Sequence, residues 1–217
     1  MPALITWWTT DVLALAPDAD PTAVQDTGAE LLRRWTEPHR RYHGTRHLVE
    51  IFWALDELTE EGGLDRRDAT VGRIAGWLHD AVYDPHAAPG DTERASAALA
   101  RELLPHAGLA DTDVSTVERL VLATIAHEPP TPATDLDRAF LDADLWILSA
   151  PDERFDEYCA QVRDEYAHVP DAAYRVGRSA ILHRLAERTP RYLTTYAARE
   201  WEPRVDANLV RELARLS

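Results

Sequence analysis

Histidines and aspartates occur in this sequence at positions that suit a metal ion. The chain has nine histidines. His43 and His47 are four residues apart, so on a helix they would share one face. His79 and Asp80 are adjacent and follow the apolar segment 74–78. Imidazole and carboxylate side chains together suit a divalent cation, so this pattern predicts a metal site.

Two further carboxylates lie inside an apolar run. Asp142 and Asp144 interrupt residues 140–148, FLDADLWIL, where an ionised carboxylate is costly unless it is paired or bound to a metal. A cation shared with the histidines would account for them. Other interpretations stay open for each residue taken singly. Any one of the histidines can be a buried residue that is only hydrogen-bonded. His79 can lie at a helix C-terminus beside a surface Asp80. Asp142 or Asp144 can pair with an arginine.

The elements that must position these residues are predicted to be helices. Apolar residues recur at three- and four-residue intervals, and strand-like alternation is nearly absent. We expect an all-α single domain over 1–217, with the metal-site motifs within 39–148 and the helices of 152–217 completing a bundle. The expected helices cover about 22–35, 48 to the Gly62-Gly63 pair, 67–81, 92–104, 113–127 and 135–148, followed by three stretches after 152 that are separated at Pro170 and at Thr189-Pro190.

The order of a histidine, then His-Asp, then aspartate resembles the signature of the HD superfamily of metal-dependent phosphohydrolases. Three segments carry the likeness: 41–48 (RYHGTRHL), 76–85 (GWLHDAVYDP) and 140–145 (FLDADL). The chain is similar to a bacterial subgroup of predicted HD phosphohydrolases, and the likeness covers most of the chain, including Gly177-Arg178 in the C-terminal half. It departs from the common pattern at Gly44, where many relatives have asparagine.

The resemblance implies an HD-type helical bundle and a divalent metal, which would be Mn, Mg, Co, Ni, Zn or Fe. The implied metal ligands are His47, His79, Asp80 and Asp144. Asp144 matches the family aspartate better than Asp142 does, because Ala-Asp-Leu is the usual context. Asp80 would also orient the attacking water. His43 matches the position that in related enzymes donates a proton to the leaving group, and the alternative is that His43 only caps the start of a helix.

Residues around the motifs are candidates for contact with a phosphate. Because the chain has no lysine, the positive charge must come from arginine, whose guanidinium binds phosphate bidentately. The candidates for substrate binding are Arg40, Arg46, Tyr42, Tyr83 and His127, with Arg41 as a third arginine. Asp84 and His127 are candidates for a second metal. The alternatives are salt-bridged arginines, tyrosines that only pack, and a His127 that caps a helix C-terminus.

Composition excludes several kinds of chemistry. The chain has 38 acidic and 23 basic residues and a net charge of −15. Without lysine there is no Schiff-base amine and no phosphate-loop lysine, and with Cys159 as the one cysteine there is no intrachain disulfide. The acidic balance argues against a nucleic-acid polymer or an anionic membrane as partner. No apolar run reaches the roughly 18 residues of a membrane span and no secretory signal is recognisable, so we expect a cytoplasmic protein.

The function that these observations predict is hydrolysis of a phosphate ester. The substrate would be a small phosphorylated metabolite, either a nucleotide or another phosphomonoester, attacked by a metal-activated water. Two alternatives from other classes are an HD-type diiron oxygenase, which would need extra histidine ligands, and a non-catalytic helical module that binds a metal or ligand. Assembly into a homo-oligomer is a further expectation that the sequence does not test.

Overall fold

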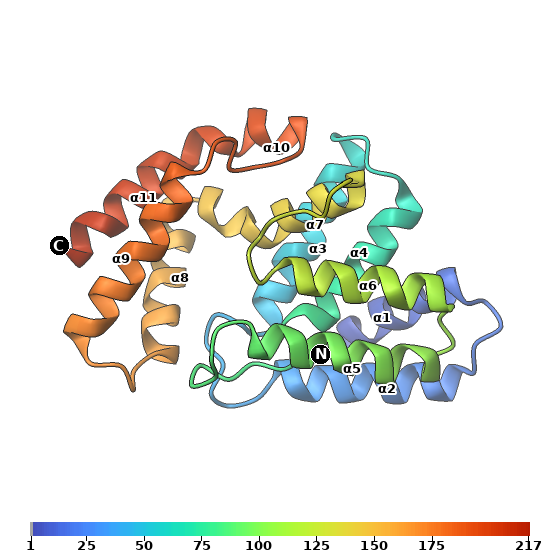
Figure 1. The fold of residues 1–217 in the computed structure, drawn as a ribbon. Helices are drawn as coiled ribbons and strands as arrows, with labels where there is room; N and C mark the ends of the chain where they lie inside the picture. The colour runs from blue at the N-terminus through green and yellow to red at the C-terminus, as the bar shows by residue number, and fades with distance from the viewer. Residues whose placement is uncertain (1) are drawn as a thin grey trace.

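The computed structural model describes residues 2–217, and within this range the regular elements are all helices, with no strand (Figure 1). None of the helices described is both long and apolar enough to cross a lipid bilayer. The elements are α1 (Pro2–Leu15), α2 (Pro21–Trp35), α3 (Thr45–Glu60), α4 (Arg66–His79), α5 (Asp91–His106), α6 (Asp111–Ala123), α7 (Asp135–Asp144), the 3₁₀ helix η1 (Leu145–Ser149), α8 (Asp152–Glu165), α9 (Asp171–Glu187), α10 (Thr195–Glu200) and α11 (Glu202–Leu216). The all-α prediction is confirmed.

The helices form two groups that meet along η1. Helices α1 to α7 lie on one side, and α8, α9 and α11 lie on the other (Figure 1). One buried apolar cluster extends through both groups, from Leu4 in α1 to Leu209 in α11. Polar contacts reinforce the junction: the buried Arg154 Nη2 donates to Glu50 Oε2 at 2.8 Å, and Asn208 Nδ2 donates to the carbonyl oxygens of Leu148 and Ala150.

Several helix boundaries differ from those expected. Helix α1 was not predicted, because its apolar and polar residues are not segregated onto separate faces, although Trp8 and Val12 are fully buried. Helix α6 ends at Ala123, four residues before His127, which has a φ of 50°. The predicted helix 135–148 changes to 3₁₀ geometry after Asp144. The last predicted stretch is two helices, α10 and α11.

Close packing of α3 against α4 fixes the relative position of the first two motifs. A Cβ atom added at Gly76 would lie 3.3 Å from Ile51 Cγ2 and from Phe52 Cε1, so a larger residue would push the helices apart. On the opposite side of α4, the indole Nε1 of Trp35 donates to the carbonyl oxygen of Trp77 at 2.8 Å. The last turn of α4 is therefore held between α2 and α3.

Candidate metal centre

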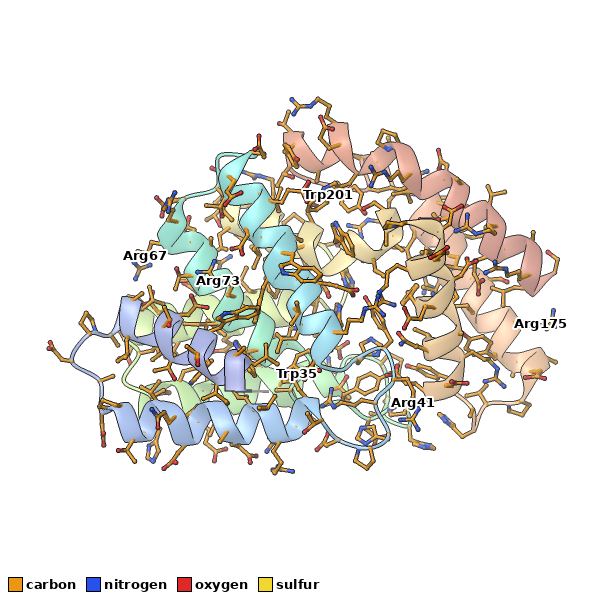
Figure 2. All side chains as sticks on the ribbon, turned by 180° about the vertical axis from the view of Figure 1, so that it is seen from behind. Trp35, Arg41, Arg67, Arg73, Arg175 and Trp201 are labelled. Carbon is orange, nitrogen blue, oxygen red and sulfur yellow. The ribbon has the colours of Figure 1, made fainter. Side chains whose placement is uncertain are left out.

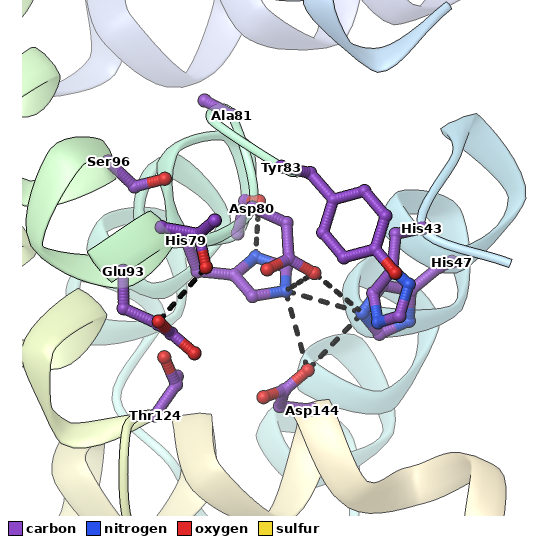
Figure 3. Close-up of polar contacts among 12 residues, drawn as sticks. His43, His47, His79, Asp80, Ala81, Tyr83, Glu93, Ser96, Thr124 and Asp144 are labelled. Carbon is purple, nitrogen blue, oxygen red and sulfur yellow. Dashed lines mark hydrogen bonds and ion pairs between the residues drawn. The ribbon is translucent and has the colours of Figure 1, made fainter. Parts of the chain in front are cut away.

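Four side chains from three elements converge at the end of α4 (Figure 3). His47 from α3 and His79 from α4 bring their Nε2 atoms to 3.3 Å from each other. Asp80 Oδ2 lies 3.0 Å from His79 Nε2 and 3.8 Å from His47 Nε2. Asp144 Oδ1, from the last residue of α7, lies 3.3 Å and 3.4 Å from the same two nitrogens. The structure thus brings together the four residues that the resemblance implies as ligands.

The donor atoms fit a metal ion. His47, His79 and Asp80 form a group whose ligand atoms lie within 4.8 Å of one another, and this group could hold a metal ion. The two imidazoles are almost fully buried, at 3% and 2% exposure. His79 Nδ1 donates to the carbonyl oxygen of Gly76 at 2.9 Å, which leaves the Nε2 lone pair of a neutral ring free for a cation. His47 Nδ1 lies 3.1 Å from the hydroxyl of Tyr42, and when this nitrogen carries the proton the Nε2 lone pair of His47 is also free for a cation.

The electrostatics of the centre show why a cation suits it. Burial disfavours the charged form of His79, but the charges of Asp80 and Asp144 outweigh burial and raise its pKa well above the ordinary value. Burial would raise the pKa of Asp144, yet His79 together with hydrogen bonds from His127 and His47 holds it well below. The two carboxylates therefore stay ionised and require a positive charge between them, which a proton on His79 or a metal ion can supply.

His43 is oriented by a buried carboxylate from the C-terminal half. Its Nδ1 lies 2.7 Å from Glu165 Oε2, and its ring stacks on Tyr83 with centroids 4.3 Å apart. The Tyr83 hydroxyl donates to the same Glu165 oxygen at 2.9 Å. Burial opposes the protonated form of His43, but the hydrogen bond and charges of Glu165 and Asp80 raise its pKa. A protonated His43 is what a proton donor requires.

Glu165 also fastens the loop before α3. Its Oε1 accepts hydrogen bonds from the backbone N–H groups of Arg41, Tyr42 and His43 at 2.7 to 3.0 Å. Burial would raise the pKa of this carboxyl, but the hydrogen bond and charge of His43 and the backbone N–H groups lower it to about 2. Glu165 was not expected from the sequence, because a single glutamate at a helix end has no pattern that distinguishes it from a solvated one.

Glu165→Gln is expected to lower the free energy of unfolding at neutral pH by about 3 kcal/mol. The pKa of Glu165 is lowered from its ordinary 4.5, so the stabilisation is complete above pH 4.5 and is lost as pH falls towards 2. Urea unfolding of both proteins between pH 7 and pH 3 would measure this difference. The difference in the free energy of unfolding should become smaller below pH 4.5. A difference that does not depend on pH would show that the ionised Glu165 carboxylate is not what stabilises the wild type.

His127 joins the centre through Asp144. Its Nε2 lies 3.0 Å from Asp144 Oδ2, and its carbonyl oxygen accepts a hydrogen bond from Arg188. The alternative considered for His127, a C-terminal helix cap, does not apply, because α6 ends at Ala123. Within residues 2–217 no arginine forms an ion pair with Asp144, so the arginine partner considered for it from the sequence is absent there.

Asp142 has a structural role and does not belong to the candidate metal centre. Its carboxylate accepts hydrogen bonds from the backbone N–H groups of Leu193 and Thr194 and from the Thr194 hydroxyl at 2.7 to 2.8 Å. These bonds fasten α7 to the segment that precedes α10. Burial raises the pKa of Asp142 to about 6, although the three hydrogen bonds lower it. The arginine partner that the sequence suggested for it is replaced by backbone donors.

The arginines of the first motif do not reach the centre as free phosphate ligands. Arg40 is buried, and its guanidinium donates to the carbonyl oxygens of His43, Asp80 and Ala81 at 2.8 to 3.1 Å. This residue therefore joins the loop to the end of α4 and has no N–H group directed at a substrate. Arg46 is exposed and pairs with Glu157 and Glu50. Arg41 lies on the loop after α2 and donates to the carbonyl oxygens of Pro38 and Arg40 (Figure 2).

The other predicted substrate and second-metal residues fall in different places. Tyr42 is buried and lines the centre, where it holds His47. Tyr83 lies against His43 and Glu165, outside the cavity of the centre. Asp84 is exposed, and its Oδ1 accepts the backbone N–H of His86 at 2.9 Å, as in a turn. The prediction of Asp84 as a second-metal ligand is therefore not supported by its position.

A cavity of about 210 Å³ opens onto the metal centre. Besides the four candidate ligands, His43 and His127 line it. Four polar residues of its wall were not expected from the sequence: Glu93, Thr124, Tyr158 and Arg178. The Thr92-Glu93 pair is typical of a helix start, which conceals Glu93 in the sequence, although Figure 3 shows it beside the centre with Thr124. Apolar side chains from η1 and α9 form the remainder of the wall.

Comparison of the chain with protein-family models, with curated proteins and with solved structures finds no match.

Proposed function

We propose that this protein is a metal-dependent hydrolase that cleaves phosphate esters of small metabolites. The observation that carries the proposal is the convergence of two imidazole Nε2 atoms and two carboxylates on one cavity. A second support is the order of these residues in the chain, which resembles the signature of HD phosphohydrolases. When bound, a divalent cation would polarise the phosphoryl group and acidify a water molecule.

The chain's own residues supply the remaining chemistry. His47, His79, Asp80 and Asp144 would hold the cation. His43, whose Nδ1 is engaged by Glu165, retains Nε2 for donating a proton to the departing alkoxide. Asp80 and Glu93 are carboxylates of the cavity wall, so they can orient a water molecule and accept its proton.

The proposal is tested by a screen of the purified protein against phosphate monoesters, diesters and nucleotides. Each assay is run after EDTA treatment and after addition of Mn²⁺, Co²⁺, Zn²⁺ or Mg²⁺. We expect phosphate release that EDTA abolishes and one of these cations restores, because the cation supplies the nucleophile. A protein that binds none of the cations, or whose activity is unaffected by EDTA, would contradict the proposal.

His127 favours a second candidate, an iron-dependent oxygenase, since it places an additional imidazole 3.0 Å from Asp144. Measurements on the same purified protein distinguish the oxygenase from the hydrolase. Elemental analysis that finds two irons per chain, together with oxygen consumption in the presence of an organic substrate, would support the oxygenase. A single non-redox cation and phosphate release support the hydrolase.

A further inference from the structure

Arg178 is a buried cation without a carboxylate partner in the wall of the metal-centre cavity. It lies on α9, is 8% exposed, and lines the cavity that the four metal ligands share. Its Nε and Nη2 atoms are buried and have no hydrogen-bond partner. Within residues 2–217 no carboxylate lies within ion-pair distance of it. Its guanidinium carbon lies 5.0 Å from the ring centroid of Tyr158, which provides a cation–π contact.

The other buried arginines show what Arg178 lacks. Arg40 donates to three carbonyl oxygens, and Arg154 forms a two-bond ion pair with Glu50. A buried guanidinium with unused N–H groups is costly, because it has lost water without gaining acceptors. An anion that enters the cavity could supply the missing acceptors.

The two unpartnered atoms also specify the shape of that anion. Nε and Nη2 lie on one edge of the planar guanidinium and donate in parallel, a geometry that matches two oxygens of one phosphate or carboxylate. Because Asp80 and Asp144 of the same cavity favour a cation, an anion bound there would be held between that cation and Arg178. A phosphate has enough oxygens to contact both, and a phosphate monoester leaves three of them unesterified.

We propose that Arg178 binds the phosphate group of the substrate through Nε and Nη2, and that the substrate is a small phosphate monoester. This inference rests on the proposed function and gives its substrate class. The cavity, at about 210 Å³, is smaller than the roughly 300–1,000 Å³ of typical ligand pockets. It therefore accommodates the phosphate end of a substrate, and Ile147, Ile181 and Leu185 contact the portion next to it.

The inference assigns to α9 a role that the sequence concealed. The Gly177-Arg178 pair reads as part of helices that complete the bundle, whereas the structure places Arg178 in the same cavity as the metal ligands. It also replaces Arg40 and Arg46 as the arginine that meets the phosphate.

The test is calorimetric titration with inorganic phosphate, on the EDTA-treated protein and on the protein with Mn²⁺. Arg178→Gln should weaken phosphate binding by about 10- to 100-fold, because charge-assisted hydrogen bonds are lost. The phosphate affinity of Arg178→Lys should lie between those of the wild type and Arg178→Gln, since lysine keeps the charge but not the paired donors. The matched control is Arg175→Gln, one turn earlier on α9. Arg175 lies at the edge of the molecule (Figure 2) and donates to the carbonyl oxygens of Arg215 and Ser217, so its variant should bind phosphate like the wild type.

The outcomes separate this inference from the proposed function. Equal phosphate affinity in wild type, Arg178→Gln and Arg178→Lys would overturn the inference, even if the protein hydrolyses esters with a metal. The same is true if the wild type binds no phosphate at millimolar concentration. If the protein has no hydrolase activity yet Arg178→Gln weakens phosphate binding, the anion site stands and the proposed reaction fails. Thermal unfolding of each variant shows that a loss of binding is measured on folded protein.

Discussion

Replacement of His79 by alanine is expected to abolish divalent-metal binding and, with it, phosphate-ester hydrolysis. His79 Nε2 is the atom on which the centre converges, within 3.0 to 3.4 Å of Asp80, His47 and Asp144. Even residues that only orient metal ligands change metal affinity by about 10- to 100-fold, so loss of a ligand should exceed about 100-fold. Hydrolysis should fall to the level of the EDTA-treated wild type.

Metal titration followed by elemental analysis measures this effect. His106→Ala is the matched control, because His106 is exposed at the last residue of α5 and distant from the four ligands in the fold. It should leave metal content unchanged. Retention of a full metal equivalent by His79→Ala would show that the cation binds elsewhere in the chain.

The wild-type titration should also depend on pH. Burial opposes the charge on His79, but Asp80 and Asp144 raise its pKa well above the ordinary value, so a proton competes with the cation for Nε2. Metal affinity should therefore rise with pH across the neutral range, and binding should release protons. A competing proton at this position cannot exist in His79→Ala.

Replacement of His43 by glutamine is expected to lower kcat by about 100- to 10,000-fold, the range of general acid–base catalysis, without loss of the metal. His43 lines the cavity but is not one of the group that could hold the metal. Steady-state kinetics together with metal analysis separate this result from that of His79→Ala. His183→Gln, on the exposed face of α9, is the control.

The alkaline limb of the kcat profile tests the role of Glu165 as a positioning residue. Burial disfavours the protonated form of His43, and the hydrogen bond of Glu165 is the strongest factor that raises its pKa against burial. Glu165→Gln should therefore lower the pKa of His43, so that the proton donor is lost at a lower pH and the alkaline limb moves in the same direction. An unmoved limb, or an unchanged kcat in His43→Gln, would assign proton donation to another group.

The candidate metal residues could be recognised in the sequence because most of them carry local signals, and the resemblance implied the set of four. His79-Asp80 follows an apolar helix, and Asp144 interrupts another, where a carboxylate is costly without a partner. The choice between Asp142 and Asp144 depended on the resemblance. In the structure the choice depends on helix geometry, since side chains two positions apart on a helix point in directions that differ by about 200°. Asp142 faces the segment before α10, while Asp144 faces the histidines.

The phosphate ligands could not be predicted in the same way. Arg40 and Arg46 belong to the first motif in the chain, yet Arg40 donates to carbonyl oxygens and Arg46 pairs with Glu50 and Glu157. Proximity in sequence does not show where a long, flexible side chain ends. The partners of such a side chain are decided by the elements packed around it.

By itself, the sequence determined the helical class, the acidic and lysine-free character, and the residues that form the candidate metal centre. These follow from hydrophobic periodicity and from side-chain chemistry, both of which are local properties. Only the tertiary structure decided that Glu165 orients His43 and that Arg178 lies in the wall of the same cavity. Both residues come from the C-terminal helices, more than 100 positions away from His43. Glu165 and Arg178 reach these positions because their helices pack against segments that are distant in the chain, and no local sequence pattern indicates such packing.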